Sequence, residues 1–379
     1  MRAVRSAGLE DRYRVTYAGA DLDIVEEFDP TAFLREWEGV SADGIVGTKD
    51  RSALLAALLA ERRGLPGPTP EALLACQYKP TAREIQRRAA PAATPHFAVL
   101  DPLHPPFDFP FFAKPIVGRL SQSAVRVGSQ ADLRNLQENE QYTRRYAEIA
   151  ALAGMDPGSV LGFLAEELLT GDEVTLEGYV YRGHVTTVGV TDSVKYAGTD
   201  SFERFEYPSK LSQEHQAELS AIAERVMPAF GFECGFFNIE LFVKPNCPPS
   251  LIEVNGRIAS QFAPLVQTLH GRSTYDALFA LACGDDPAWK SGLPDGVGIS
   301  YCVRVFEDAF VEAVPDPEPG LEILVAPGLR LSEQGVNDAA SYRLAIFSEF
   351  GETREEAVAR CLDRARSLNF RLQATAPVR

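Results

Sequence analysis

The chain has 379 residues, of which 45% are hydrophobic and 24% are charged, a composition typical of a globular protein with a sizeable core. This length suits two or three packed subdomains better than a single one. Fifty-three acidic residues against 37 basic ones give a net charge of -16, which disfavours nucleic acid and anionic membranes as partners.

The six cysteines are scattered without CxxC spacing, which argues against a zinc site and a disulfide framework. This cysteine usage fits the reducing cytoplasm. No apolar run approaches the length of roughly 18 to 20 residues that a membrane helix needs, and the first residues lack the apolar core of a signal peptide. We therefore expect a cytoplasmic protein without a membrane partner.

Residues 1-80 form the first block of the chain. An amphipathic helix is predicted at 31-37, a buried strand at 42-48, and an alanine-rich helix from residue 50 to the glycines and proline at 64-67. A strand followed by a helix indicates an α/β layer. We therefore expect an N-terminal α/β domain.

Residues 81-290 form the second block, which begins within a basic helix predicted at 79-88 and continues through a proline-rich linker. Three short strands and a charged helix predict a small α/β module at about 109-170. Alternating residues after 173 then predict antiparallel strands, a helix near 212-231, and two further strands at 235-243 and 250-258. Residues 291-379 add strands and a final helix, which we expect to complete the core.

Polar side chains interrupt the last two strands of this block. Alternation places Glu240 on one face of the first strand, and Glu253, Asn255 and Arg257 together on one face of the second. A short turn joins the strands, so they can pair antiparallel and bring the acids together. Facing acids repel unless a cation lies between them, and oxygen ligands of this kind suit Mg²⁺, with Mn²⁺ as an alternative. Glu240, Glu253 and Asn255 are therefore predicted metal ligands.

The sequences NIELFV and LIEVNGR resemble the metal-binding strands of the ATP-grasp superfamily, which carry a Glu followed by Glu-x-Asn-x-Arg. Other landmarks of the family appear in order over about residues 75-270: QYKPTAREI, FFAKP and AEELLTGDEVTLEG. The resemblance implies an α/β (α+β) fold of three parts, in which the nucleotide binds between a small lid module and a larger antiparallel-sheet core. It also points to the branch that contains L-amino acid ligases and biotin carboxylase-like enzymes.

The resemblance implies a set of nucleotide contacts. Lys79, followed by Arg83, and Lys114 take the places of the lysines that contact phosphates, and the loop after Lys114 contributes Ser121. The hinge between lid and core, where the family binds adenine and ribose, corresponds to Glu166, Glu167, Leu168, Leu169 and Glu173. The loop around Ser121 has fewer glycines than the family usually carries.

Two further residues are candidates for the substrate pocket, Ser260 and His270, which follow the second metal strand. Arg257 is the predicted catalytic residue, together with Asn255. The planar guanidinium of Arg257 matches a phosphate or a carboxylate. Because Arg257 follows Asn255 by two residues, we expect it to lie beyond the metal, on the side where the acceptor binds.

The resemblance implies an ATP-dependent carboxylate-amine ligase, which forms an amide through an acyl phosphate and releases ADP and phosphate. The expected partners are a small carboxylate, such as an amino acid, and an amine. Two alternatives stay open, a bicarbonate-activating enzyme and a non-catalytic ATP-binding regulator. After Arg257 the chain has Ile258-Ala259-Ser260-Gln261-Phe262, where bicarbonate-activating relatives carry a Gln-Val-Glu-His type run. The sequence allows a homodimer but does not fix the oligomeric state.

Overall fold

The computed structural model describes residues 8-16, 28-118, 123-137, 140-290, 292, 294-334 and 341-374. Its N-terminal part is helical, and the short helix η1 (Leu9–Asp11) lies against the later helix α10. Four helices follow: α2 (Pro30–Glu38), α3 (Asp50–Arg62), α4 (Pro70–Gln77) and α5 (Lys79–Ala89). Asp29 and Thr69 accept backbone N–H bonds at the starts of α2 and α4, which fixes where these helices begin.

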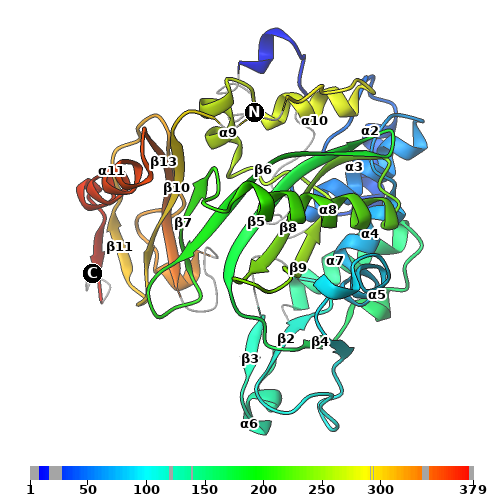
Figure 1. Cartoon of the computed structure of the whole chain (residues 1–379), viewed down its shortest axis with the longest axis horizontal. Coiled ribbons are helices and arrows are strands. Elements are labelled where there is room, and N and C mark those ends of the chain that lie inside the picture. Colours follow the sequence, from blue (N-terminus) through cyan, green and yellow to red (C-terminus); the bar gives the residue numbers. More distant parts are fainter. Residues whose placement is uncertain are drawn as a thin grey trace.

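A small four-stranded sheet projects from the body of the molecule, at the bottom of Figure 1. Its strand order is β1-β4-β2-β3, and all of its pairs are antiparallel. The strands are β1 (Phe97–Val99), β2 (Phe111–Pro115), β3 (Val125–Val127) and β4 (Phe163–Glu166). Its own apolar cluster includes Phe111 and Leu133, the latter from helix α6 (Gln130–Arg134). We call this sheet, together with α6, the lid.

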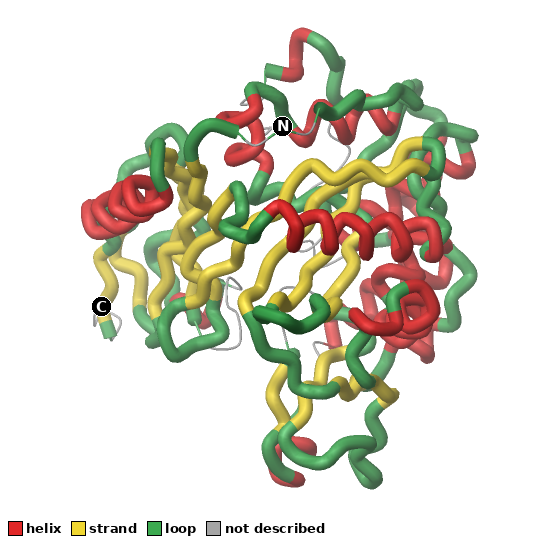
Figure 2. The backbone as a smooth tube through the Cα atoms, in the orientation of Figure 1, coloured by secondary structure: helices red, strands yellow, loops and turns green. Residues whose placement is uncertain are grey.

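The core is an eight-stranded antiparallel sheet with the order β12-β13-β10-β7-β6-β5-β8-β9. Its strands are among the yellow segments across the middle of Figure 2. Its central strands are β5 (Asp172–Tyr181), β6 (His184–Lys195), β7 (Phe202–Tyr207), β8 (Cys234–Val243) and β9 (Ser250–Asn255). The C-terminal part adds β10 (Val297–Val305), β12 (Leu321–Ile323) and β13 (Tyr342–Gly351), with β10 hydrogen-bonded to β7. The residues after 290 therefore extend the same sheet.

Helices cover this sheet on both sides. Helix α8 (Gln213–Ala229) packs on β5 and β6, where Leu176 and Ile239 join Ile222 in the main apolar core. Other elements complete the chain: α7 (Glu140–Leu152), η2 (Pro91–Ala93), η3 (Pro157–Val160), α9 (Ala263–His270), α10 (Thr274–Ala282), β11 (Phe310–Ala313), η4 (Leu331–Glu333), α11 (Arg354–Ser367) and β14 (Arg371–Gln373). Within the described segments, we find no helix with the length and apolarity that a membrane span requires.

Two sequence-based expectations about local structure differ from the fold. Residues 42-48 form a loop and not a strand. This loop passes so close to its neighbours that a Cβ at Gly44 or Gly47 would lie within 3 Å of backbone atoms of Ala282 or Ser52. The described part of residues 8-80 is accordingly helical, without the predicted strand of an α/β layer.

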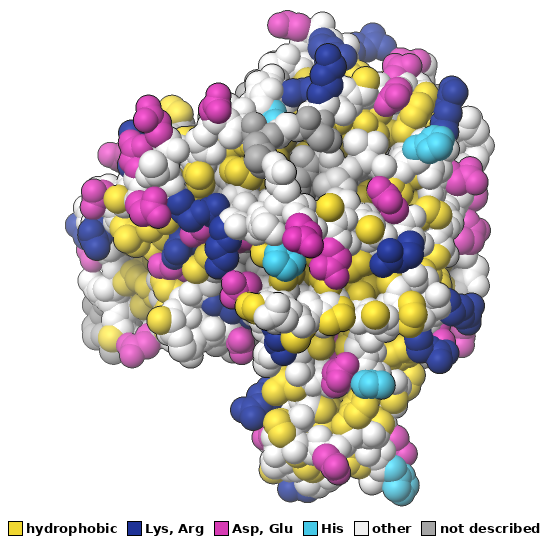
Figure 3. Space-filling model, in the orientation of Figure 1, with side chains coloured by type: hydrophobic (Ala, Val, Ile, Leu, Met, Phe, Trp, Pro, Cys, Tyr) yellow, Lys and Arg dark blue, Asp and Glu magenta, His cyan; other side chains and the backbone are white. Residues whose placement is uncertain are grey.

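The charged helix predicted within the lid module is divided into α6 and α7. Helix α7 packs on α3, and its Tyr146 and Ile149 belong to the main core. Of these two helices, α6 packs on β3 of the lid sheet. The space-filling view shows the lid below the body, with acidic and basic side chains interspersed over this face of the molecule (Figure 3).

Candidate functional site

Two acidic side chains face each other on the last two strands of the core sheet. Glu240 on β8 is the register partner of Glu253 on β9, and a bulge follows directly after this pair. Burial, reinforced by the charges of Glu253 and Glu173, raises the pKa of Glu240 to about 8. Two carboxylates so placed favour either a shared proton or a cation between them.

Two asparagines form the next pair along the same strands. Asn255 lies opposite Asn238 and donates from Nδ2 to Asn238 Oδ1 at 3.0 Å and to Glu240 Oε1 at 3.2 Å. With its amide nitrogen used in this way, the Asn255 carbonyl oxygen is the atom suited to bind a cation. Asn238 donates in turn to the backbone carbonyl of Arg257 at 2.9 Å.

These side chains fit a hard divalent cation such as Mg²⁺, which takes carboxylate and amide oxygens. The donors are two carboxylates and one amide, Glu240, Glu253 and Asn255. In the described parts of the chain there is no cluster of three or more His, Cys, Asp or Glu side chains that could hold a metal. A cation at this place would therefore need further ligands, and the phosphates of a nucleotide would supply them.

A buried ionic cluster connects the lid to α5 and to the core sheet. Glu166 on β4 lies 2.9 Å from Lys114 Nζ and accepts from Arg83 Nε at 2.6 Å. Although burial alone would raise its pKa, Lys114 and Arg83 lower the pKa of Glu166 to about 2. Both cations also donate to the backbone carbonyl of Ile252, which lies next to Glu253. Lys114, which was predicted to contact phosphate, is thus held beside strand β9.

Burial also affects Lys114 itself, and lowers its pKa to about 8 with a further contribution from the neighbouring charge of Arg83. Lys79 begins α5, and its Nζ lies 3.4 Å from Glu253 Oε1. The two predicted phosphate lysines therefore approach the acidic pair from different elements, Lys79 from a helix and Lys114 from the lid. The sequence indicated Lys79, Lys114 and Glu166 separately, and the structure brings them together.

The hinge residues have more varied surroundings. Glu167 is used within the lid, where its Oε1 accepts from the backbone N–H of His96 at 2.9 Å. Leu168 is exposed and Leu169 half-buried in the connection to β5. Glu173 is paired with Lys195 at 3.3 Å, and burial raises the pKa of this glutamate despite that partner. The predicted contact at Ser121 lies outside the described residues.

Lys195 was not among the predicted site residues. Its Nζ lies 5.7 Å from the ring centre of Phe202 and 5.8 Å from that of Phe242, in addition to its pairing with Glu173. The sequence did not indicate that Lys195 belongs to the site, because its partners lie on three other strands, β5, β7 and β8. The structure therefore adds a cation to the part of the site that contains Glu173.

Arg257 lies beyond the end of β9, in the turn that follows Asn255. The prediction that Arg257 shares a strand face with Glu253 and Asn255 is therefore wrong, because the strand ends at Asn255. Its guanidinium pairs with Asp50, with Nε 2.5 Å from Oδ1 and Nη2 3.4 Å from Oδ2. This pairing raises the pKa of Arg257 further above its usual value, although burial acts in the opposite direction. The sequence contained no signal that connected residues 207 positions apart.

Glu177 is a second acid that sequence reasoning missed. It lies on β5 opposite Asn238, and its Oε1 accepts from the backbone N–H of Ala259 at 3.0 Å. Burial raises its pKa to about 8. Alternation along β5 could have indicated it, because Thr175, which lies two residues earlier, is the register partner of Glu240. Glu177 thus shares a face with the acidic pair.

The two predicted substrate residues have tyrosines as hydrogen-bond partners. His270 Nε2 lies 2.7 Å from the hydroxyl of Tyr207, and partial burial lowers the pKa of His270. Ser260 is exposed, and its side chain is hydrogen-bonded to Tyr275. Both residues contact tyrosines of the core around α9 and α10. Their roles toward a substrate stay predictions.

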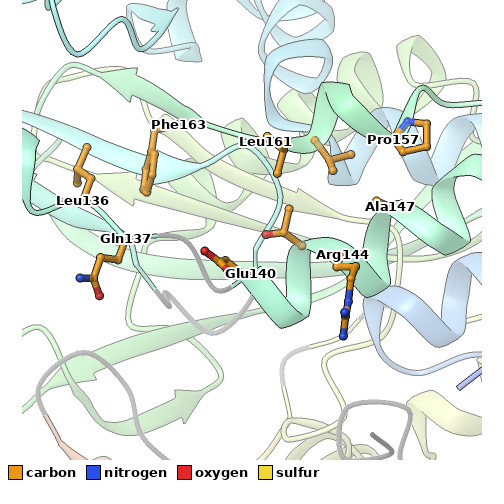
Figure 4. A pocket seen from close by; sticks show the side chains of 10 residues that line it. Leu136, Gln137, Glu140, Arg144, Ala147, Pro157, Leu161 and Phe163 are labelled. Carbon is orange, nitrogen blue, oxygen red and sulfur yellow. The ribbon is translucent and has the colours of Figure 1, made fainter. Parts of the chain in front are cut away.

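A cavity of about 960 Å³ lies away from these side chains. Its lining comes from α7, η3, β4 and the segment before α7, and includes Glu140, Arg144 and Phe163 (Figure 4). None of the described site residues predicted from the sequence lines it. We therefore do not assign this cavity as the candidate functional site, although it is large. The charged groups that converge lie elsewhere, between the lid and strands β8 and β9.

Comparison with known proteins agrees with this arrangement. Residues 107–264 match the model of the ATP-grasp domain family. Carnosine synthase 1 of Gallus gallus is 29% identical over 266 residues, which cover 67% of this chain and 28% of that protein. The chain therefore spans less than a third of the length of this relative.

Solved structures share the fold over nearly the whole chain. The L-amino acid ligase from Bacillus licheniformis has a TM-score of 0.73 at 18% identity, covering 93% of this chain and 86% of its own. The biotin carboxylase domain of the Hydrogenobacter thermophilus 2-oxoglutarate carboxylase, solved with MgADP, ADP and bicarbonate, has a TM-score of 0.67 at 14% identity, covering 95% of this chain and 80% of its own. The predicted mixed fold with an antiparallel core sheet and a small lid is confirmed. Residues 107–264 therefore match the ATP-grasp domain family in sequence, and the chain shares the fold of these solved structures.

Proposed function

We propose that the chain is an ATP-dependent carboxylate-amine ligase that forms an amide bond and releases ADP and phosphate. The observation that supports this most is the convergence of opposite charges on one face of the core sheet. Glu240 and Glu253 lie opposite each other there, with Lys79 3.4 Å from Glu253 and Lys114 beside the same strand. Such a site suits a polyphosphate with a divalent cation.

Each group has a defined part in this proposal. Lys79 and Lys114 bind phosphate oxygens, and Glu240, Glu253 and Asn255 hold Mg²⁺, which neutralises phosphate charge when bound. Glu173 and the connection at residues 167-171 lie where β4 of the lid joins β5 of the core, so they would contact the nucleoside. Arg257 would stabilise the charge on the phosphoryl group or on the carboxylate that receives it.

The chemistry has two balanced steps. A carboxylate oxygen attacks the terminal phosphorus of ATP, which forms an acyl phosphate as the bond to ADP breaks. The nitrogen of an uncharged amine then attacks the acyl carbon, so that an amide forms and inorganic phosphate leaves with the electron pair of the broken bond. The proton that the amine nitrogen loses in this step passes to the departing phosphate. No protein nucleophile is needed, because the substrate carboxylate and the amine are themselves the nucleophiles.

The relatives favour an amino acid or a related carboxylate as the substrate. One is an L-amino acid ligase and another a carnosine synthase, by their names. Two alternatives remain, a bicarbonate-activating enzyme and a nucleotide-binding regulator without turnover. The residues that follow Arg257 differ from those of bicarbonate-activating relatives, which favours the ligase. We propose a small carboxylate and an amine as the partners, and a homodimer remains a prediction.

ADP release against panels of amino acids would test the proposal, with mass spectrometry of the products. A ligase should release ADP only when both a carboxylate and an amine are present, and the product should have their combined mass less one water. Release that depends on bicarbonate instead would identify the carboxylating alternative. Nucleotide binding without turnover on any pair would favour the regulator.

A further inference from the structure

Asp50 and Arg257 form an ion pair that connects the N-terminal helices to the face with the acidic pair. Arg257 Nε lies 2.5 Å from Asp50 Oδ1, and the two side chains keep 24% and 17% of their surface exposed. We propose that Asp50 is a positioning residue, which holds the guanidinium of Arg257 so that its outer edge binds the anion at the site. The inference rests on the proposed function for the identity of that anion, a phosphate or a carboxylate.

The guanidinium has two edges that can each form paired hydrogen bonds with an anion. Asp50 occupies the edge formed by Nε and Nη2, since these atoms donate to its two oxygens. The edge formed by Nη1 and the second hydrogen of Nη2 remains. The carbonyl of Ile258 is 3.5 Å from Nη1, a weak contact that an anion could replace. Asp50 thus determines which edge of Arg257 is offered to a substrate.

Asp50 is itself fixed by its place in the fold. It is the first residue of α3, where the partial positive charge of the helix start stabilises a carboxylate. The turn before it is closed by the bond from the Lys49 N–H to Ser52 Oγ at 3.1 Å. Gln77 donates from Nε2 to the backbone carbonyl of Asp50 at 3.0 Å. These hydrogen bonds hold the backbone from which the Asp50 carboxylate extends.

The backbone of Arg257 is held from the opposite side by the core sheet. Asn238 donates to the carbonyl of Arg257 at 2.9 Å, and Glu177 accepts from the N–H of Ala259 at 3.0 Å. These contacts fix the backbone of the turn but not the guanidinium at the end of a flexible side chain. The pair with Asp50 supplies that last constraint. Without it, the guanidinium would sample several rotamers and bind an anion less well.

The same contact allows an opposite interpretation. Asp50 could compete with the substrate anion for the guanidinium, and removing its charge would then strengthen anion binding. The two interpretations differ in sign, so the substitution Asp50→Asn separates them. Its amide keeps the shape of the side chain but loses the charge and one of the two acceptors.

The test uses the full chain and two measurements. In the first, inorganic phosphate is titrated into the protein saturated with MgADP, and its affinity is measured by calorimetry. Asp50→Asn should weaken phosphate binding about 10- to 100-fold, the usual effect of losing a partner that orients a ligand, and should leave the affinity for MgADP unchanged. Equal or tighter phosphate binding in Asp50→Asn, or no phosphate binding by the unmodified chain, would overturn the proposal.

The second measurement is amide-forming turnover in a double-mutant cycle with Arg257→Lys. If Asp50 acts through Arg257, the double variant should be no slower than Arg257→Lys alone within about twofold, whereas independent roles would give additive losses. Asp50→Glu, which keeps the charge, should recover part of the rate. Additive losses, or no recovery in Asp50→Glu, would contradict positioning.

Asp308→Asn serves as the matched control, because Asp308 pairs with Arg330 at 2.8 Å with similar exposure but lies in the C-terminal part, outside the site. It should change neither measurement. If the unmodified chain forms no amide from any substrate pair while phosphate binding still depends on Asp50, the proposed function fails and the positioning role stands. If Asp50→Asn does not fold, Asp50→Glu must still show weakened phosphate binding from the displaced carboxylate, and unchanged binding would refute the role.

Discussion

Glu240 and Glu253 are register partners on β8 and β9, so two carboxylates lie side by side on adjacent strands of the core sheet. Glu253→Gln should fold normally, because the two side chains are nearly the same shape. It removes a charged cation ligand, so we expect amide-forming turnover to fall on the order of 100-fold at limiting Mg²⁺. Rates measured over a Mg²⁺ series test this. Turnover equal to that of the unmodified chain at the lowest Mg²⁺ would exclude Glu253 as a ligand.

The raised pKa of Glu240 predicts how Mg²⁺ binding depends on pH. With a pKa of about 8, this carboxyl holds a proton at neutral pH in the metal-free protein, and the proton must leave when the cation binds. Mg²⁺ affinity should therefore rise with pH up to about 8 and then level off.

The same shift affects stability. A raised carboxyl pKa means that the folded protein binds more protons than the unfolded one, so metal-free stability should fall as the pH rises from about 4.3 toward 8. The increase in melting temperature caused by Mg²⁺ should be larger above pH 8 than below it. Glu240→Gln should remove this difference, and a Mg²⁺ effect independent of pH in the unmodified chain would contradict the assignment.

Lys114 should contribute to ATP affinity through its charge. Lys114→Ala removes a buried cation that we propose to bind the phosphates, and we expect ATP binding to weaken about 10- to 100-fold, as for a charged hydrogen bond. Because the pKa of Lys114 is lowered to about 8, ATP affinity of the unmodified chain should also fall as the pH rises through 8. Calorimetry at several pH values measures both effects. Lys290→Ala removes an exposed lysine and is the control.

Glu166 should matter for stability as well as for binding. Glu166→Gln leaves Arg83 and Lys114 buried without their carboxylate, which should destabilise the fold by about 3 to 5 kcal/mol. Since the pKa of Glu166 is lowered to about 2, its contribution is complete above about pH 4.3 and is lost as the pH falls toward 2. Urea unfolding at several pH values measures this. Glu84→Gln, which breaks an exposed pair with Arg87, should cost less than about 1 kcal/mol.

Arg257→Lys should reduce turnover while ATP binds with near-normal affinity. A lysine cannot pair with both oxygens of Asp50 and also offer two parallel N–H groups to an anion. Stopped-flow measurement of the chemical step, together with ATP calorimetry, separates rate from affinity. Full ligase activity in this variant, or losses of rate and ATP affinity in equal proportion, would show that Arg257 has another role.

The sequence predicted the acidic pair because alternation along two short strands is a local pattern. Once the turn between them is recognised, antiparallel pairing brings Glu240 and Glu253 together without knowledge of the rest of the fold. The division into a nucleotide lid and a larger antiparallel-sheet core followed from the family resemblance. The loop at 42-48 could not be predicted in this way, because its close packing against Ala282 brings together residues far apart in the sequence.

The partners of the site residues were also beyond local reasoning. Asp50 meets Arg257, and Glu166 meets Arg83, only because α3 and α5 pack beside the core sheet and the lid. A charged residue on a helix reads as a solvent-facing residue when its partner is 80 or more positions away. Asp50 and Lys195 were therefore missed, because tertiary packing creates their surroundings.

The pairing of strands β7 and β10 has a consequence for any attempt to shorten the chain. Gly298, Ile299, Ser300 and Tyr301 pair with residues 204-207, and β13 then pairs with β10. Removing residues after 290 would leave β7 as an edge strand with unsatisfied N–H and C=O groups, and would uncover apolar side chains next to it. Such an edge recruits strands from other molecules. A protein truncated after residue 290 should therefore precipitate during expression instead of yielding a smaller soluble domain. A shortened chain should keep every strand of the core sheet.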